Sequence, residues 1–178
     1  MIKKERAWIE VNRENLKNNV NELKKCLREE CEIMAVVKAN SYGHGDILVS
    51  RELNRLGIYN FAVATLTEAI RLRQKKIEGN ILVLGYTSPR EAKEIYKYDI
   101  IQTIIDDKYA KELDESGYRV RAHVKIDTGM PVSYTHLRTV RQKEMHCMQN
   151  STHGMAMTVP GLRRLSVLRI LIWKIIFS

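Results

Sequence analysis

Short apolar runs alternate with segments of helical periodicity over the first 130 residues of the chain. Six runs rich in Ile, Val and aromatic residues predict strands, at residues 7–11, 32–39, 60–65, 80–87, 100–105 and 120–126. Between most of them lie segments with one apolar helical face or a capping residue at the start, at residues 13–27, 66–77, 88–98 and 106–118. Strands that alternate with helices in this way predict right-handed βαβ units and a parallel sheet.

Two α/β architectures fit this pattern, an open doubly wound sheet and a (β/α)8 barrel. No GxGxxG motif follows the first predicted strand, which weakens the dinucleotide-binding version of the doubly wound sheet. A complete barrel takes about 250 residues. This chain has 178 residues, and its pattern ends after the sixth predicted strand. The pattern of strands and helices therefore leaves both architectures open.

The composition changes after Met130. Residues 131–178 hold seven Lys and Arg against one Asp or Glu, whereas residues 1–130 hold 23 against 20, so most of the net charge of +9 lies in the C-terminal part. That part also lacks the βαβ pattern. Its first seven residues, PVSYTHL, can be encoded by the transposase recognition end that is ligated to DNA in sequencing libraries. We interpret residues 1–130 as one domain and expect residues 131–178 to be an artefactual, poorly ordered tail.

Charge, leader sequence and cysteine content exclude several classes of protein. The basic tail has no helix-turn-helix pattern, zinc-ligand spacing or aromatic RNA-binding signature, and its apolar end is too short to span a membrane. The N-terminus, MIKKERAWIE, becomes charged where a secretory signal becomes apolar, so we expect a cytoplasmic protein. Cys26, Cys31 and Cys147 form no CxxC pair and are odd in number, which predicts reduced thiols.

Residues 34–45, MAVVKANSYGHG, carry the strongest chemical signal. The apolar residues before Lys38 place its amine at the C-terminal end of a predicted interior strand, where barrel enzymes build their sites. Desolvation there disfavours the charged amine, which makes a Schiff base with a carbonyl cofactor accessible. The turn that follows has glycines, which let backbone N–H groups approach an anion, and Tyr42 offers a hydroxyl. Together these features predict a pyridoxal phosphate pocket.

The segment AVVKANSYGHG resembles the cofactor attachment motif of the alanine racemase family, and HVKIDTGM resembles a later strand and acidic turn of the same family. RAWIEVNRENLKNNV, FAVATLTEAIRLR and ILVLGYT are similar in style and order, so the resemblance covers about residues 6–130. It implies an α/β fold, an incomplete (β/α)8 TIM-type barrel of about six βα units, with the family's C-terminal β domain absent.

The resemblance also implies roles for individual residues. Lys38 would hold pyridoxal 5'-phosphate as a Schiff base and then act as general acid or base on one face of the substrate Cα. Tyr42 would contact the phosphate. Lys125 stands where the family often has a carbamylated lysine that orients an arginine, but Val132 occupies the place of that arginine. No metal is implied.

Three further residues in these motifs have structural interpretations. We expect His44 to shape the cofactor turn without transferring protons, and His123 to pack inside the barrel. Asp127 could cap the turn that follows the last predicted strand by accepting backbone N–H bonds.

The implied function is interconversion of L- and D-alanine for cell-wall precursor supply, in a homodimer without a nucleic-acid or membrane partner. Racemisation needs a base on each face of Cα, and the family's second base lies in its C-terminal domain, so we expect this chain to be inactive. Two alternatives stay open: a pyridoxal-phosphate carrier or homeostasis protein that holds the cofactor on Lys38 without turnover, and the catalytic domain of a serine racemase.

Overall fold

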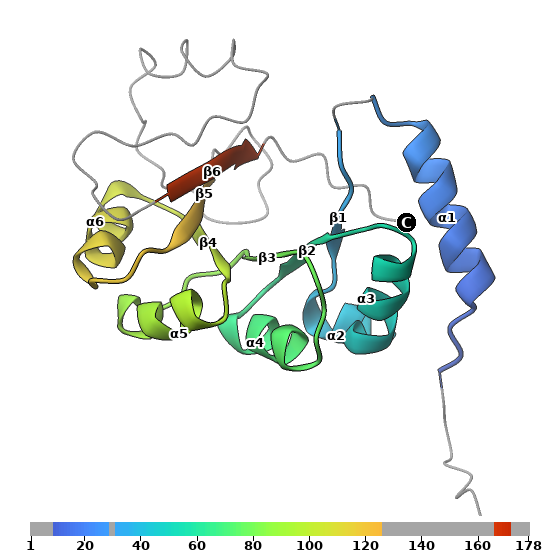
Figure 1. The fold of residues 1–178 in the computed structure, drawn as a ribbon, viewed down its shortest axis with the longest axis horizontal. Helices are drawn as coiled ribbons and strands as arrows, with labels where there is room; N and C mark the ends of the chain where they lie inside the picture. The colour runs from blue at the N-terminus through green and yellow to red at the C-terminus, as the bar shows by residue number, and fades with distance from the viewer. Residues whose placement is uncertain (1–8, 29–30, 126–165, 172–178) are drawn as a thin grey trace, which may run out of the picture. The chain divides into compact units, whose positions relative to one another are not determined.

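The computed structural model describes residues 9–28 and 31–125, and residues 166–171 as backbone only. Figure 1 shows an α/β fold in which short strands alternate with helices. The elements, in chain order, are α1 (Arg13–Lys25), β1 (Met34–Val36), α2 (Lys38–Tyr42), α3 (Asp46–Arg55), β2 (Asn60–Val63), α4 (Leu66–Gln74), β3 (Asn80–Val83), η1 (Pro89–Glu91), α5 (Ala92–Lys97), β4 (Ile101–Ile104), α6 (Asp107–Glu115), β5 (Arg121–Lys125) and β6 (Ser166–Leu171).

The chain divides into two compact units, and the boundary between Leu82 and Val83 falls in β3. In the first unit the strands follow the order β1-β2-β3. β1 and β2 pair in parallel, with Val36 opposite Ala62. The core of this unit consists of fully buried apolar side chains from the strands and from α4, namely Phe61, Ala62, Val63, Ala69, Leu72, Ile81 and Leu82.

The second unit continues the parallel arrangement, in the order β3-β4-β5-β6. β4 pairs with β5, and β5 pairs with β6 with one irregularity between Ala122 and His123. The buried Tyr109 hydroxyl donates to the carbonyl oxygen of Thr87 at 2.7 Å, and burial raises the pKa of Tyr109. In neither unit does the strand order reverse, whereas a doubly wound sheet reverses at its switch point. The order is that of consecutive barrel units.

The predicted parallel α/β pattern is confirmed in five of the six strands and in all four predicted helices. Side-chain caps mark several helix starts. Ser88 caps η1, Asp106 caps α6 and Thr65 caps α4. Cys26 and Cys31 are exposed free thiols, as predicted. Among the described residues, no helix is long and apolar enough to cross a membrane.

The strand predicted at residues 7–11 is wrong where the structure describes it. Residues 9–11 belong to no strand, and Ile9 is 66% exposed. Apolar and β-branched residues favour a strand mainly through the surface they pack against. Ile9 and Val11 are both exposed. The chain instead runs directly to Asn12, whose side chain accepts the N–H of Asn15 and caps α1.

Besides α2, whose residues were predicted as a strand end and a turn, two elements were not predicted. The first is α3, which buries Asp46, Ser50 and Leu53. Two of these three residues are polar, so the buried face has no apolar periodicity. The second is β6, which lies in the part of the chain for which no strand was expected. Asp127, Val132 and the other residues of 126–165 and 172–178 lie outside the described residues.

Candidate functional site

Lys38 lies just beyond the carboxyl end of a strand, as predicted, two residues after β1 ends at Val36, but β1 is an edge strand of the described sheet and not the interior strand expected. Before it stands Val37, which is 2% exposed and donates its N–H to the carbonyl oxygen of Ala62 at 2.9 Å. This bond ties the end of β1 to β2. Lys38 itself is partly buried. A primary amine therefore lies at the carboxyl end of two paired parallel strands.

The residues after Lys38 form a left-handed turn. Ala39, Asn40, Ser41 and Tyr42 have φ values of 50°, 57°, 52° and 53°. Left-handed backbone costs about 1–2 kcal/mol for each residue that carries a Cβ. Four such residues in succession need support from their surroundings, because their own conformational preference opposes the turn.

The amides of this turn already donate to carbonyl groups within it. The Gly43 N–H points to the carbonyl oxygens of Ala39 and Asn40, at 3.2 and 3.1 Å, and the Gly45 N–H donates to that of Asn40 at 2.9 Å. The N–H groups of Gly43 and Gly45 are therefore satisfied within the turn. The Tyr42 hydroxyl is the predicted phosphate contact in the turn, and Tyr42 is 50% exposed.

His44 contributes to the shape of the turn. Its Nδ1 lies 2.8 Å from the carbonyl oxygen of Ser41, and its backbone N–H donates to the same oxygen at 3.0 Å. For the ring to donate there, Nδ1 must carry the proton. These contacts support the prediction that His44 shapes the loop.

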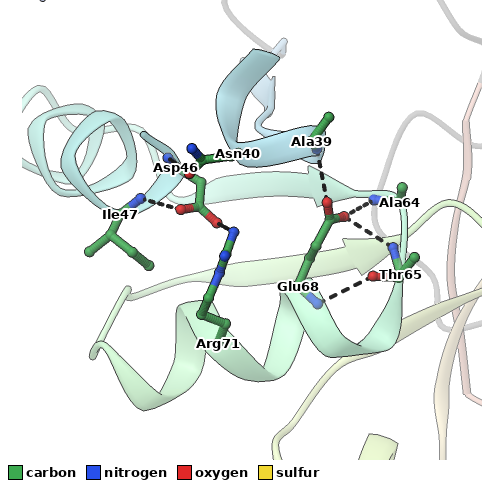
Figure 2. A network of polar contacts seen from close by, with 8 residues as sticks. All are labelled: Ala39, Asn40, Asp46, Ile47, Ala64, Thr65, Glu68 and Arg71. Carbon is green, nitrogen blue, oxygen red and sulfur yellow. Dashed lines mark hydrogen bonds and ion pairs between the residues drawn. The ribbon is translucent and has the colours of Figure 1, made fainter. Parts of the chain in front are cut away.

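A carboxylate from α4 contacts the start of the turn. Figure 2 shows Glu68 between the ends of β1 and β2. Its Oε1 accepts the N–H of Ala39 at 2.8 Å, and its Oε2 accepts the N–H groups of Ala64 and Thr65 at 2.8 and 3.2 Å. The Thr65 hydroxyl in turn accepts the N–H of Glu68 at 3.3 Å, which completes a capping box.

A second connection joins α4 to the far end of the turn. Asn40 Oδ1 accepts the N–H of Asp46 at 3.1 Å, and the Asp46 carboxylate pairs with the guanidinium of Arg71, one helical turn beyond Glu68 (Figure 2). The Asp46 side chain is 4% exposed, whereas that of Arg71 is 46% exposed. Neither Glu68 nor this pair was predicted as part of the site. Only the Thr-x-x-Glu capping pattern was visible in the sequence.

The other predicted residues belong to the second unit. Lys125 is the last residue of β5 and is partly buried, and His123 is 5% exposed within the same strand. The burial of His123 confirms the prediction that it packs inside the fold. The structure thus brings Lys38 and Tyr42 into one turn and places Lys125 at another strand end.

The first unit offers chemistry that fits an aldehyde cofactor carrying a phosphate. Lys38 supplies a primary amine that can bind an aldehyde carbon. Tyr42, four residues on, supplies a hydroxyl donor for an anionic group. The N–H groups of Gly43 and Gly45, which donate within the turn, are not part of this donor set.

Comparisons with known proteins agree with one another. The family model for the N-terminal domain of alanine racemase matches residues 11–133. An amino-acid racemase of Enterococcus faecalis is 50% identical over 126 residues, which cover 71% of this chain and 18% of that protein. Alanine racemase 1 of Caldanaerobacter subterraneus subsp. tengcongensis is 42% identical over 126 residues, covering 68% of this chain and 32% of the relative.

A solved structure is similar over more of the chain. The alanine racemase from Bacillus anthracis with bound L-Ala-P matches with a TM-score of 0.74 at 29% identity, over 92% of this chain and 40% of that one. The chain thus spans less than half the length of each of these relatives.

Proposed function

Because the chain belongs to the alanine racemase family, we propose that it is the cofactor-binding part of a pyridoxal-phosphate-dependent racemase that interconverts L- and D-alanine. The observation that carries this proposal is the position of Lys38, at the carboxyl end of β1 and directly before the left-handed turn that contains Tyr42. The activity, its amino-acid substrate and a homodimeric assembly are proposed for the longer protein. A cytoplasmic location is part of the same proposal.

The residues of this unit have distinct tasks in such a reaction. Lys38 holds the cofactor through Nζ, and Tyr42 holds its phosphate through the hydroxyl. When bound, the cofactor withdraws electron density from the substrate Cα and weakens its C–H bond. Lys38 Nζ, when not bonded to the cofactor, would take or return a proton at one face of the substrate Cα. The tie between Val37 and Ala62 keeps the strand end that carries Lys38 in place. We assign Lys125 a supporting role without contact to the substrate.

Cofactor trapping on the chain as it stands tests the proposal. The protein is mixed with an equal amount of pyridoxal 5'-phosphate, reduced with borohydride, digested and examined by mass spectrometry. We expect the reduced adduct on the peptide that contains Lys38. At this ratio, scattered modification of surface lysines without an adduct at Lys38 would refute the proposed function.

The Tyr42→Phe variant tests the phosphate contact. Hydrogen bonds to charged groups contribute about 1.5–3 kcal/mol, so we expect affinity for pyridoxal 5'-phosphate to fall by about tenfold or more. Affinity for pyridoxal, which lacks the phosphate, should stay unchanged, because only the phosphate uses the hydroxyl. Absorbance titration measures both. Tyr59→Phe is the matched control, since Tyr59 is similarly exposed (47%) in the same unit but outside the turn. Equal losses for both ligands would assign Tyr42 to packing.

A further inference from the structure

Glu68 makes two contacts more than a helix start requires, to the N–H groups of Ala39 and Ala64. In a capping box, the glutamate side chain returns to the backbone N–H of the capping residue, which is Thr65 here. That bond uses Oε2. The other oxygen, Oε1, reaches the N–H of Ala39, 29 residues earlier in the chain, at 2.8 Å. The capping of α4 gives no reason for this contact with Ala39.

The contact lies where the left-handed turn begins. Ala39 is the residue next to Lys38 and the first of the four with positive φ. A carboxylate that holds its N–H fixes the peptide plane between Lys38 and Ala39, and with it the direction in which the chain leaves β1. The same carboxylate holds the N–H of Ala64 just after β2. Glu68 therefore links the ends of two adjacent strands at the position of the amine.

The far end of the turn is held from the same helix face. Arg71 pairs with Asp46, and the N–H of Asp46 donates to the side chain of Asn40 within the turn. Glu68 and Arg71 are three residues apart, so they lie on one side of α4 (Figure 2). The helix thus contacts the turn directly at its start and through Asp46 at its end.

We propose that Glu68 is a positioning residue for Lys38, one that holds the left-handed turn and so presents the amine to the cofactor. The inference rests on the proposed function, because it assumes that Lys38 binds the cofactor. Glu68 itself touches neither cofactor nor substrate in this assignment. It acts through the peptide group that follows Lys38.

The Glu68→Gln variant tests the assignment. Glutamine keeps the shape of the side chain but has an NH2 group in place of one of the two acceptor oxygens. Whichever side this NH2 group faces, it cannot accept a hydrogen bond there, either from Ala39 or from Ala64 and Thr65. We expect the rate of adduct formation between pyridoxal 5'-phosphate and Lys38 to fall by about tenfold, the effect of losing one charge-assisted hydrogen bond. Hydrogen exchange at the Ala39, Gly43 and Gly45 amides should accelerate in the same variant, with no cofactor present.

Two controls separate positioning from general stability. Thr65→Ala removes the hydroxyl that caps α4 but leaves both oxygens of Glu68, so it should lower stability without changing the Lys38 rate or the exchange of the turn amides. Glu52→Gln makes the same chemical change on α3. Glu52 accepts bonds from Arg13 and Arg55, which lower its pKa, and none of its hydrogen bonds involves the turn.

Each outcome has a definite meaning. If wild-type protein forms no adduct at Lys38, the proposed function fails. If wild-type protein forms the adduct and Glu68→Gln forms it at the same rate, the positioning role is overturned while the function stands. Should Glu68→Gln fail to fold, amide exchange of the wild-type protein still decides. An unprotected Ala39 amide would show that Glu68 does not hold the turn, and a protected one would support the assignment.

Discussion

Replacing Lys38 with alanine should abolish the adduct that borohydride traps at this site, while the helices and strands of the first unit remain. The loss is complete because the bond to the cofactor's aldehyde needs a primary amine, and the next residues of the turn carry none. The fold should persist because the partly buried Lys38 follows the strand and has no place among its buried apolar residues. Mass spectrometry of the digested protein measures the adduct, and circular dichroism measures the fold.

Lys125→Ala is the matched control for this prediction. Lys125 is also partly buried and also stands at the carboxyl end of a strand, β5. We expect this variant to keep the adduct at Lys38 in full yield, since Lys125 is assigned no bond to the cofactor. If a strand-end amine were sufficient, both lysines would be modified and each single variant would retain half the label. An unchanged yield in Lys38→Ala would contradict the assignment of the cofactor to this amine.

The position of Lys38 could be predicted from sequence because it depends on a local rule. The apolar run before Lys38 predicts a strand, and a lysine at its end places the amine near the strand's carboxyl end. The structure has Lys38 there, after Val36 and Val37. The left-handed turn could not be predicted in this way. Ala39 and Ser41 have no preference for positive φ, and the partners that hold the turn come from α3 and α4, farther along the chain.

The same distinction applies to the fold. Helix starts such as those at Thr65 and Ser88 are fixed by a side chain that bonds within its own turn, so they could be predicted from the sequence. Helix α3 could not be predicted in this way, because its buried Asp46 pairs with Arg71 of another helix, a contact that only the tertiary structure supplies. Ile9 and Val11 show the opposite error, a strand that was predicted but does not form. Both residue types favour strands, but these two side chains are exposed and not packed as strand residues are.

Gly79→Ala should destabilise the protein by about 4 kcal/mol or more, well above the usual range for single substitutions. Gly79 has a φ of +95°, and a Cβ added to it would lie 2.0 Å from the carbonyl oxygen of Tyr59. That oxygen cannot move freely, because it accepts the N–H of Asn80 at 2.7 Å, the bond with which β3 begins beside β2. Relief of the overlap would break this pairing. Urea denaturation measures the free energy of unfolding.

Gly57→Ala separates the steric overlap from backbone strain. Gly57 also has a positive φ, +79°, but the nearest atom to an added Cβ is the flexible Lys24 Nζ at 3.8 Å. Its replacement should therefore lower stability by only about 1–2 kcal/mol, the strain of a left-handed residue with a side chain. The difference between the two variants then reports the closeness of Gly79 to Tyr59. Equal losses of stability in the two variants would mean that the start of β3 can shift to make room for an extra methyl group. The close approach of Gly79 to Tyr59 would then not determine where β3 joins β2.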